Sequence, residues 1–588
     1  MKKFYSKIKN FSSTKSIKTS CFLMLCIIIS FNSSAQAPDW LWAENFGGKL
    51  VEHMSHVETD SQGNIYGLIL TYSDTLIIGT DTLVNKDPSS TFYDIVVAKF
   101  DPTGNPLWAR AIQSQDSDLG YSLNLDKNGN CYVAGGTYGE YLSFGSTTLT
   151  NPYSPKTAIF YAKYAPDGNL LWAKMVSGNG YQEAYGIRAI ASGGFYISGR
   201  FTSPSLVFGS ITLTKHGNEN YTGDVFIAKC DDNGNTIWAK CIGGVKDDES
   251  SACAIDNDEN MYITGYFRSP TLNFGTTTIS NSTGHWETFV AKYNSSGVEQ
   301  WAKCAATSND NISGRNIRVD NNNNCYVIGY ILGTFANIGG IILNNAGSHD
   351  MYIAKFDQSG NFVFAKSFGG AYSDEISGIC IDTNNDIYIT GYFASPQISF
   401  DGFTLTNNSL PEDMDGFVSK LNSNGTCIWV KQFGNEKNES GGGIALEPDG
   451  KLIVSGMYNS SPFTLGTTNM YVQSSQDADM FLAKLDNTVI TANETSLNAA
   501  NFSIYPNPAI TETFIDFNLK TNSQTTVEIF NISGKKVTTL LNKQLTHGNY
   551  SVRWDLTGDK NNVVANGMYL CKINSGNEIN TSKFLIKR

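Results

Sequence analysis

The chain has 588 residues, with 42 lysine and arginine residues against 54 aspartate and glutamate residues, and a net charge of −12 at pH 7. An acidic balance of this size disfavours nucleic acid and other polyanions as partners. Runs rich in Val, Ile, Tyr and Phe alternate with Gly, Asn and Asp, and no stretch beyond the N-terminus keeps a helical apolar period. An all-β fold is therefore expected.

The N-terminus has the pattern of a signal peptide, which we assign to residues 1–37. Six lysines up to Lys18 precede an apolar core at Cys21–Phe31, and the small residues of "SSAQA" predict cleavage after Ala37. The core is too short to span a bilayer as a helix. No later segment is apolar enough to cross a membrane, so the sequence does not predict an integral membrane protein.

From Pro38 onward the chain repeats with a period of 63 to 66 residues. Such a period indicates a repeat architecture. Each repeat carries strand-like runs such as "NMYITGYF" (Asn260–Phe267) and "TFVAK" (Thr288–Lys292). An aromatic anchor, usually in Trp-Ala-Lys, marks each repeat, at Trp42, Trp108, Trp172, Trp238, Trp301, Phe364 and Trp429.

The spacing between two repeated positions predicts how the repeats close into a ring. A lysine that ends the third strand precedes the next anchor by nine residues in six repeats, which indicates a tight hairpin with a fixed bulge. Nine residues after the seventh such lysine, Lys484, lies Asn493, whereas Trp42 has no lysine before it. We therefore expect a seven-bladed β-propeller over residues 38–486. Its last blade would combine strands near Gly443–Glu447, Leu452–Met457, Met480–Lys484 and Leu41–Asn45.

A second repeated element lies between the second and third strands of several repeats. It reads as a small hairpin at Leu142–Asn151, Leu206–Lys215, Leu272–Asn281 and Ile398–Asn407. Together with "D-x-x-G-N-x-Y-V-x-G" and "D-x-F-I-A-K-x-D-x-x-G-N-x-x-W-A-K", these repeats resemble the bacterial SBBP-type β-propeller repeats. The resemblance implies a propeller architecture and is only weakly tied to any activity.

The C-terminal part of the chain changes character. Residues 487–500 are polar and are expected to form a linker, and residues 501–588 carry several short alternating strands that predict a small β-sandwich. Predicted strands lie at Thr513–Leu519, Thr525–Val537, Gly548–Leu556, Gly567–Ile573 and Thr581–Arg588.

This tail resembles the type A C-terminal sorting domain of the type IX secretion system. The resemblance rests on "NISGKKV" (Asn531–Val537), on "NGMYL" (Asn566–Leu570), and on the sorting-motif residues Tyr505, Pro506, Asn507, Pro508, Lys587 and Arg588. It implies a Bacteroidetes-type bacterium and contact with the type IX machinery through the tail. It also implies delivery to the outer surface of the outer membrane or release from the cell.

Charge and cysteine usage limit the partners further. Without the six leader lysines, 36 basic residues face 54 acidic ones, and residues 501–588 hold ten basic and six acidic residues. Residues 38–500 therefore carry a net charge of −22, which leaves cations, basic surfaces and neutral glycans as partners. Nine cysteines follow the leader, and most occupy strand positions where other repeats have Ile, Val, Met or Ala. We expect small core residues rather than a disulfide framework.

Catalytic motifs are not found in the sequence: it has no nucleophile elbow, phosphate loop or dinucleotide fingerprint. His53 and His56 lack a third ligand nearby and are expected in a surface loop. One repeated feature is a candidate binding site. An acidic residue follows each anchor by nine to eleven positions, at Glu52, Asp118, Glu183, Glu249, Asp310, Glu375 and Glu439.

Equivalent positions in a propeller lie on a circle, so these seven carboxylates are expected to ring one mouth of the channel. Three interpretations stay open: each carboxylate caps its own loop, the ring binds a cation such as Ca²⁺ or Mg²⁺ or a basic ligand, or it forms part of an enzyme site. No other cofactor is predicted. The leading function is a non-enzymatic binding or scaffold protein for an extracellular glycan or protein. The alternative is a polysaccharide lyase or glycosidase with its site at the channel mouth.

Overall fold

The structure is a computed structural model that describes residues 37–86, 92–219, 221–308, 310–408, 413–473, 478–487, 502–519, 521–531, 535–558, 562–575 and 578–587. The predicted signal peptide, except for Ala37, and nearly all of the predicted linker lie outside these ranges. Every regular element within them is a β-strand, as the composition predicts. The described residues contain no helix with the length and hydropathy that a membrane crossing needs.

The repeats form antiparallel sheets built on four long strands each, and an insert hairpin extends two of these sheets to six strands. The first three comprise β2 (Glu52–Thr59), β3 (Ile65–Thr71), β6 (Asp94–Phe100) and β7 (Pro106–Gln113); β8 (Asp118–Leu125), β9 (Cys131–Thr137), β12 (Ala158–Tyr164) and β13 (Leu170–Val176); and β14 (Gln182–Ala189), β15 (Phe195–Phe201), β18 (Asp224–Cys230) and β19 (Thr236–Ile242). The next three comprise β20 (Asp248–Ile255), β21 (Met261–Phe267), β24 (Glu287–Tyr293) and β25 (Glu299–Ser308); β26 (Ile312–Val319), β27 (Cys325–Ile331), β30 (Asp350–Phe356) and β31 (Phe362–Phe368); and β32 (Asp374–Ile381), β33 (Ile387–Phe393), β36 (Asp415–Leu421) and β37 (Cys427–Phe433).

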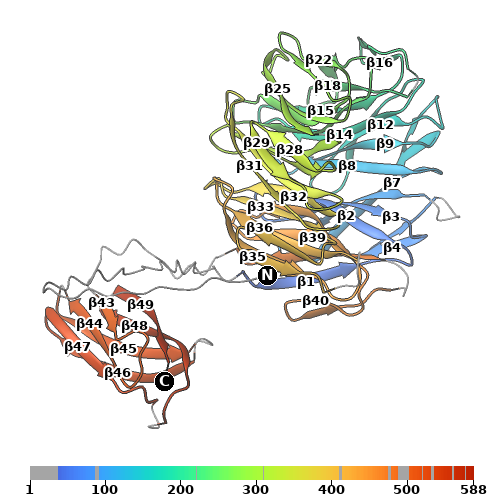
Figure 1. The fold of residues 1–588 in the computed structure, drawn as a ribbon. Helices are drawn as coiled ribbons and strands as arrows, with labels where there is room; N and C mark the ends of the chain where they lie inside the picture. The colour runs from blue at the N-terminus through green and yellow to red at the C-terminus, as the bar shows by residue number, and fades with distance from the viewer. Residues whose placement is uncertain are drawn as a thin grey trace, which may run out of the picture. The chain divides into compact units, whose positions relative to one another are not determined.

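One further sheet joins both ends of the repeat region. Its strand order is β1-β42-β39-β38, from β1 (Trp40–Phe46), β38 (Glu439–Leu446), β39 (Leu452–Tyr458) and β42 (Asp479–Leu485). Figure 1 shows the blue N-terminal strand β1 among the orange strands of this sheet. The antiparallel pairing of β1 with β42 confirms that the unpaired Trp42 strand completes the last repeat.

The sheets follow one another around an axis. The first strand of each sheet lies beside the first strand of the next, from β2 through β8, β14, β20, β26 and β32 to β38, and β38 lies beside β2. The middle strands are buried on both faces because neighbouring sheets cover them; β6, β12 and β24 are buried at every position. This arrangement of four-stranded sheets is that of a β-propeller.

Cross-strand pairs explain the invariant spacing of nine residues. The lysine that ends each third strand lies directly opposite the anchor aromatic of the fourth strand, and a bulge follows the lysine. The pairs are Lys99 with Trp108, Lys163 with Trp172, Lys229 with Trp238, Lys292 with Trp301, Lys355 with Phe364, Lys420 with Trp429, and Lys484 with Trp42. Any insertion in this hairpin would move the two side chains apart.

Several of these pairs also reach the next sheet. Lys99 Nζ and Trp108 Nε1 both donate to the carbonyl oxygen of Pro166, at 3.2 and 3.0 Å, and Pro166 lies in the turn between β12 and β13. Lys229 and Trp238 do the same to Ser295, at 3.3 and 3.2 Å. The Lys99 ammonium also lies 4.8 Å from the centre of the Tyr66 ring. The pair therefore fixes both a hairpin and the distance to the neighbouring sheet.

The predicted inserts are hairpins. They comprise β10 (Tyr141–Phe144) with β11 (Thr147–Thr150), β16 (Ser205–Phe208) with β17 (Ile211–Thr214), β22 (Thr271–Asn273) with β23 (Thr278–Ser280), and β34 (Gln397–Phe400) with β35 (Phe403–Thr406). Three more, not predicted, are β4 (Thr75–Ile78) with β5 (Asp81–Val84), β28 (Phe335–Ile338) with β29 (Ile341–Asn344), and β40 (Phe463–Leu465) with β41 (Thr468–Met470).

The tail forms two facing sheets, as predicted for a β-sandwich. One has the order β43-β44-β47, from β43 (Phe502–Tyr505), β44 (Thr513–Leu519) and β47 (Gly548–Trp554). The other has the order β46-β45-β48-β49, from β45 (Ser523–Asn531), β46 (Lys536–Leu545), β48 (Gly567–Ser575) and β49 (Glu578–Ile586). Strand β46 was not separated from β45 in the sequence. Trp554, Tyr569 and Phe584 meet in the core between the sheets.

The Trp108 contact predicts a large and specific loss of stability. Trp108 is 6% exposed, whereas its neighbour Leu107 is 52% exposed on the same strand. Trp108→Ala is expected to lower the free energy of unfolding by about 3–5 kcal/mol, because it removes a buried ring and leaves the Pro166 carbonyl one donor short. Leu107→Ala should stay within about 0.5 kcal/mol of the wild type. Urea-induced unfolding measures both; equal losses would contradict the assigned role of the anchor.

Candidate functional site: one mouth of the channel

The first residue of most first strands caps the loop before it. Gly48 N donates to Glu52 Oε2 at 2.7 Å, and Asn435 N donates to Glu439 Oε2 at 3.0 Å, each across four residues. Asp118 accepts from Ser114 Oγ at 3.0 Å in the same register. Gln182, Asp248 and Asp374 occupy the equivalent positions and bond residues 178, 244 and 370. Burial raises the pKa of the Glu52 and Glu439 carboxyls.

The strand positions of these residues correct the prediction that seven carboxylates form one ring. Glu52, Asp118 and Glu439 are fully buried caps, so the structural interpretation holds for them. Glu183, Glu249 and Glu375 lie one residue further along their strands, and this offset turns a strand side chain to the opposite face. Asp310 lies before β26, where it is exposed and accepts from Asn311 N at 2.7 Å. The seven residues therefore do not form one equivalent ring that Ca²⁺ or Mg²⁺ would bridge.

The residues one position after the caps form a different site. Glu183 pairs across the sheet with Arg200, Glu249 with Tyr266, and Glu375 with Tyr392. Tyr266 Oη donates to Glu249 Oε2 at 3.1 Å, and Arg200 Nη1 lies 3.6 Å from the same oxygen. These contacts place acids, tyrosines and an arginine together at the ends of consecutive sheets.

A β-bulge in each first strand adds further side chains. The bulged position falls at Ser55, Tyr121, Tyr185, Ser251, Arg315 and Ser377, where the register shifts by one residue. A bulge re-aims the side chain that it carries. Tyr121 and Tyr185 have ring centroids 4.7 Å apart, and both hydroxyls donate to Glu183. Arg315 lies over the Tyr330 ring, 5.3 Å from its centre.

These residues share one environment across five neighbouring sheets. The charges of Glu375 and Glu249 both act on Tyr330, whose pKa is raised chiefly by burial. Burial likewise raises the pKa of Tyr392, and its hydrogen bond with Glu375 adds to this. We call the set the mouth cluster; it comprises Tyr121, Glu183, Tyr185, Arg200, Glu249, Tyr266, Arg315, Tyr330, Glu375 and Tyr392.

The mouth is asymmetric. In the sheets that begin with β2, β8 and β38, the cross-strand pairs equivalent to Glu183 with Arg200 are His53 with Leu70, Leu119 with Gly136, and Ser440 with Met457. These side chains offer little charge, so the acids and tyrosines gather on one side. The residues Arg200, Tyr266, Tyr330 and Tyr392 were not among the predicted site residues. Each directly follows the glycine that ends the second-strand motif, and this shared position was the available signal.

The interior of the channel is also polar. Glu58, Asn124, Arg188 and Arg318 occupy one register of their first strands, and Asn124 Nδ2 donates to Glu58 Oε1 at 3.3 Å. Burial, followed by the charge of Arg188, lowers the pKa of Arg318 to about 10. The guanidinium group therefore stays charged at neutral pH.

The prediction of a surface loop for His53 and His56 is wrong. Both lie on β2, inside the ring of first strands. Burial lowers the pKa of His53 to about 4. Burial and then the charge of Arg188 lower the pKa of His56 to about 3. Both imidazoles are therefore neutral at physiological pH.

The sorting-motif residues of the tail fasten the motif to the last strand. Asn507 Oδ1 accepts from Leu585 N at 2.8 Å, and the backbone of Ala509 bonds Leu585 and Lys587. Tyr505 Oη donates to Asp516 at 2.8 Å, and Pro506 O accepts from Thr513 Oγ1 at 3.1 Å. Pro508 lies between these anchored residues, and Arg588 lies outside the described residues.

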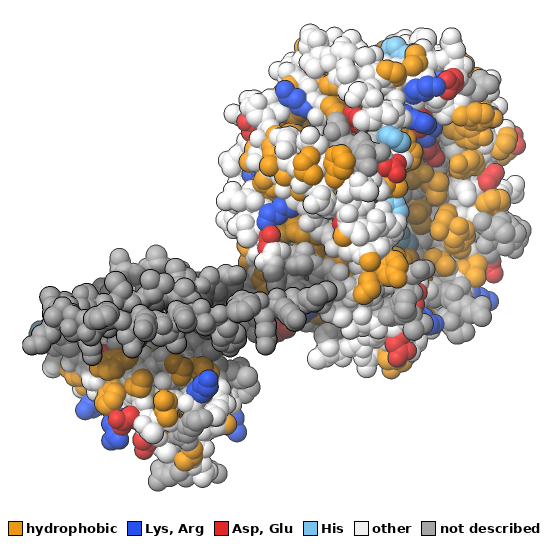
Figure 2. Space-filling view, in the orientation of Figure 1, with side chains coloured by type: hydrophobic (Ala, Val, Ile, Leu, Met, Phe, Trp, Pro, Cys, Tyr) orange, Lys and Arg blue, Asp and Glu red, His pale blue; other side chains and the backbone are white. Residues whose placement is uncertain are grey.

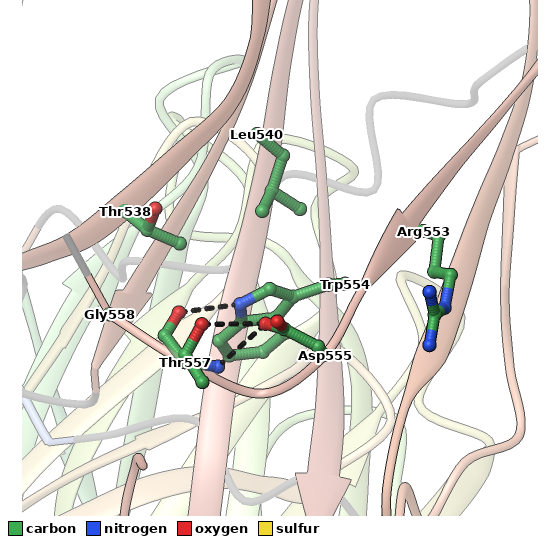
Figure 3. A pocket seen from close by; sticks show the side chains of 7 residues that line it. All are labelled: Thr538, Leu540, Arg553, Trp554, Asp555, Thr557 and Gly558. Atoms are coloured by element: carbon green, nitrogen blue, oxygen red, sulfur yellow. Dashed lines mark hydrogen bonds between the residues drawn. The ribbon is translucent and has the colours of Figure 1, made fainter. Parts of the chain in front are cut away.

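The tail also carries a shallow hollow of about 450 Å³. Figure 3 shows the side chains that line it, with Trp554 Nε1 donating to Thr557 O at 2.8 Å and Thr557 Oγ1 donating to Asp555 at 2.6 Å. These bonds pair Trp554, Asp555 and Thr557 with one another. The hollow is therefore weaker as a candidate binding site than the mouth cluster.

The fold and the tail define the class of this protein: a secreted β-propeller. Residues 503–587 match the family model of the secretion system C-terminal sorting domain. The match confirms that the tail is a sorting domain of the type IX secretion system. The protein is secreted to the cell surface or the extracellular space.

Two curated relatives resemble the repeat region. An uncharacterized WD repeat-containing protein, L264 of Acanthamoeba polyphaga mimivirus, is 23% identical over 490 residues, which is 73% of this chain and 31% of that protein. The regulatory protein FlaEY of Caulobacter vibrioides is 21% identical over 353 residues, which is 56% of this chain and 36% of that protein. The chain thus spans about a third of the length of these relatives.

Similarity to solved structures is weak. A protein of unknown function from Dyadobacter fermentans aligns over 77% of this chain and 99% of its own, with 9% identity and a TM-score of 0.35. PorZ, a surface component of the type IX secretion system of Porphyromonas gingivalis, aligns over 93% and 100%, with 9% identity and a TM-score of 0.16. Scores this low carry no argument about activity.

Glu249 predicts a pH dependence of stability. Burial raises the pKa of its carboxyl from 4.5 to about 7, although Arg200 opposes the shift. The folded chain therefore holds a proton that the unfolded chain releases, so this contribution is full below pH 4.5 and is lost as the pH rises through 7. Glu249→Gln is expected to flatten the decline of unfolding free energy in that window by up to about 1.4 kcal/mol per pH unit.

Urea-induced unfolding at a series of pH values measures this slope. Glu140→Gln, at an exposed position, is the control and should leave the slope unchanged. An unaltered slope in Glu249→Gln would show that the carboxyl is ionised in the folded protein.

Proposed function

We propose that the protein is an exported binding propeller whose mouth cluster takes a neutral, hydroxyl-rich ligand, with glycans as the ligand class. The observation that carries this proposal is the gathering of tyrosine rings with carboxylates and guanidinium groups on one side of the mouth. A binding site needs a few convergent polar groups beside apolar surface, and this combination supplies both.

The chemistry of the cluster suits sugars. Tyrosine rings offer flat apolar faces with a polar edge, and carboxylates accept hydrogen bonds from hydroxyl groups. The acidic balance of residues 38–500 opposes a polyanionic ligand. Figure 2 agrees, because acidic and basic side chains are scattered over the face in view without a continuous basic patch.

The finer architecture belongs to the same proposal. We take the propeller to span residues 38–486 with seven blades of the SBBP repeat type, because seven anchors each pair with one lysine and the pair of Trp42 with Lys484 joins the ends. A leader at residues 1–37, a linker at 487–500 and a sorting domain at 501–588 complete the chain. In this arrangement the tail directs the export of the repeat module.

An enzyme is the second candidate, supported by the carboxyls of the mouth cluster. Burial raises the pKa of Glu249 to about 7, which suits a general acid at neutral pH. Glu183 lies in the equivalent position of the preceding sheet, where two tyrosine hydroxyls donate to it. Carboxyls in unlike environments are the pattern of glycosidases.

Ligand binding tests the proposal. The full chain is applied to a glycan array, and binding should be lost or fall at least about tenfold in Tyr185→Ala, since stacking on one ring is worth about 1.5 kcal/mol. Tyr141→Ala removes an exposed tyrosine on the insert strand β10 and should bind like the wild type. Shortened products from a bound glycan would favour the enzyme. An array without any bound glycan would refute the ligand class.

Export tests the role of the tail. Deleting residues 501–588 should keep the protein inside the outer membrane, because the sorting domain is missing. The same deletion should change the melting temperature of the repeat module little, since its strands pair only among themselves in the described residues. Cell fractionation and thermal unfolding measure the two effects. Normal surface delivery of the truncated chain would contradict the sorting function.

A further inference from the structure

A histidine, an aspartate and a cysteine meet at the edge of the sheet β14-β15-β18-β19. His216 follows the insert strand β17, Asp224 begins β18, and Cys241 lies in β19. His216 Nδ1 lies 2.8 Å from Asp224 Oδ2, and Cys241 Sγ lies 3.2 Å from the same oxygen. Cys241 Sγ and His216 Nδ1 are 3.5 Å apart. Three different ligand atoms thus form a compact triangle outside the mouth cluster.

We propose that His216, Asp224 and Cys241 bind one Zn²⁺ ion per chain through Nδ1, a carboxylate oxygen and Sγ, with a fourth position open to water. Zinc bonds of about 2.0–2.3 Å in a tetrahedron place neighbouring ligand atoms about 3.4–3.6 Å apart. The three observed separations are 2.8, 3.2 and 3.5 Å. Metal binding therefore requires side-chain movements of about half an ångström and no rearrangement of the strands.

The donor set selects the metal. A thiolate and an imidazole favour zinc, whereas Ca²⁺ and Mg²⁺ prefer sites made of oxygen ligands. On binding, the Cys241 thiol releases its proton to solvent and a sulfur–zinc bond forms. The thiolate and the Asp224 carboxylate together then balance the two positive charges of the ion, while the imidazole stays neutral.

Comparison with two other sheets shows how the residue that contacts the buried carboxylate differs in this sheet. A buried carboxylate also begins the third strands β6 and β36, where it accepts from the amide of Gln113 or Gln432 on the fourth strand. An amide that donates to the carboxylate leaves it little capacity to bind a metal. Cys241 occupies the position of Gln432, so a thiol replaces that amide, and only in this sheet of the described residues does a histidine complete a group of three such ligands.

The chain contains a matched contrast in the next sheet. Cys304 Sγ lies 3.2 Å from Glu287 Oε2, in the same arrangement as Cys241 and Asp224. Thr283 Oγ1 donates to the other oxygen of Glu287 at 3.0 Å. A neutral hydroxyl is a poor zinc ligand, so this group should not bind the ion tightly.

The proposed site is held firmly on one side and open on the other. The Asp224 side chain is 1% exposed, whereas that of His216 is 51% exposed. Lys215 and Gly217, on either side of His216, line a hollow of about 500 Å³ that gives access to solvent. A bound ion would fasten the loop between β17 and β18 to β19. It would thereby couple the insert hairpin to the body of the sheet.

Zinc titration of the full chain, purified without a polyhistidine tag and stripped with a chelator, tests the proposal. Competition with a chromophoric chelator should give one bound Zn²⁺ per chain, and Co²⁺ should produce a sulfur-to-cobalt charge-transfer absorption. Cys241→Ser and His216→Ala should each weaken binding by more than the roughly 10–100-fold that loss of an outer partner costs. Zinc should also raise the melting temperature of the wild type.

Cys304→Ser is the control, because it removes a thiol that also faces a buried carboxylate, and it should bind zinc like the wild type. His216 is exposed, so His216→Ala keeps the test valid if Cys241→Ser folds poorly. Equal zinc affinity in the wild type and His216→Ala, or a cobalt complex without the sulfur absorption, would overturn the proposal.

Discussion

The contact between a lysine–tryptophan pair and the turn of the next sheet is the constraint on which the rest of the repeat module depends. Lys99 and Trp108 lie opposite each other within one sheet and donate to one carbonyl oxygen of the following sheet. The same two side chains therefore fix a hairpin and a distance between sheets. Because this geometry recurs in several repeats, sheets are placed by their predecessors, and repetition of a local contact supports the ring of first strands.

Positions outside this contact are free to differ between repeats, and the candidate functions occur there. The bulge of the first strand carries Tyr185 in one sheet and Ser251 in the next, although the surrounding strands are alike. The residue opposite the buried carboxylate is Gln432 in one sheet and Cys241 in another. The structure thus separates residues that set the architecture from residues that give single sheets their own chemistry.

The elements that follow from local spacing were predictable, and those that depend on strand register were not. The pairing of Trp42 with Lys484 followed from one invariant distance, and the hairpins followed from their turn residues. The carboxylates were misassigned because distances of nine to eleven residues from the anchor were treated as equivalent. The residue ten positions after the anchor is a buried cap, as at Gln182 and Asp248. The residue eleven positions after the anchor belongs to the mouth cluster, as at Glu183 and Glu249. One residue decides which face of a strand a side chain occupies, and composition carries no such information. The contact of His216 with Cys241 was equally hidden, because it joins an insert to a distant strand.

The sheet that contains β1 and β42 has a consequence for the order of events during synthesis. The ribosome produces Trp40–Phe46 first and Asp479–Leu485 last within the module. The sheet that contains both strands therefore cannot be completed until the final strand has been made. Until then the repeats form an open arc with two unpaired edges, which are sites for mispairing with other chains. The sorting domain at 503–587 lies after that strand in the sequence. An export signal placed there is complete only after the last strand of the ring has been made, so a truncated translation product carries no signal for the outer membrane.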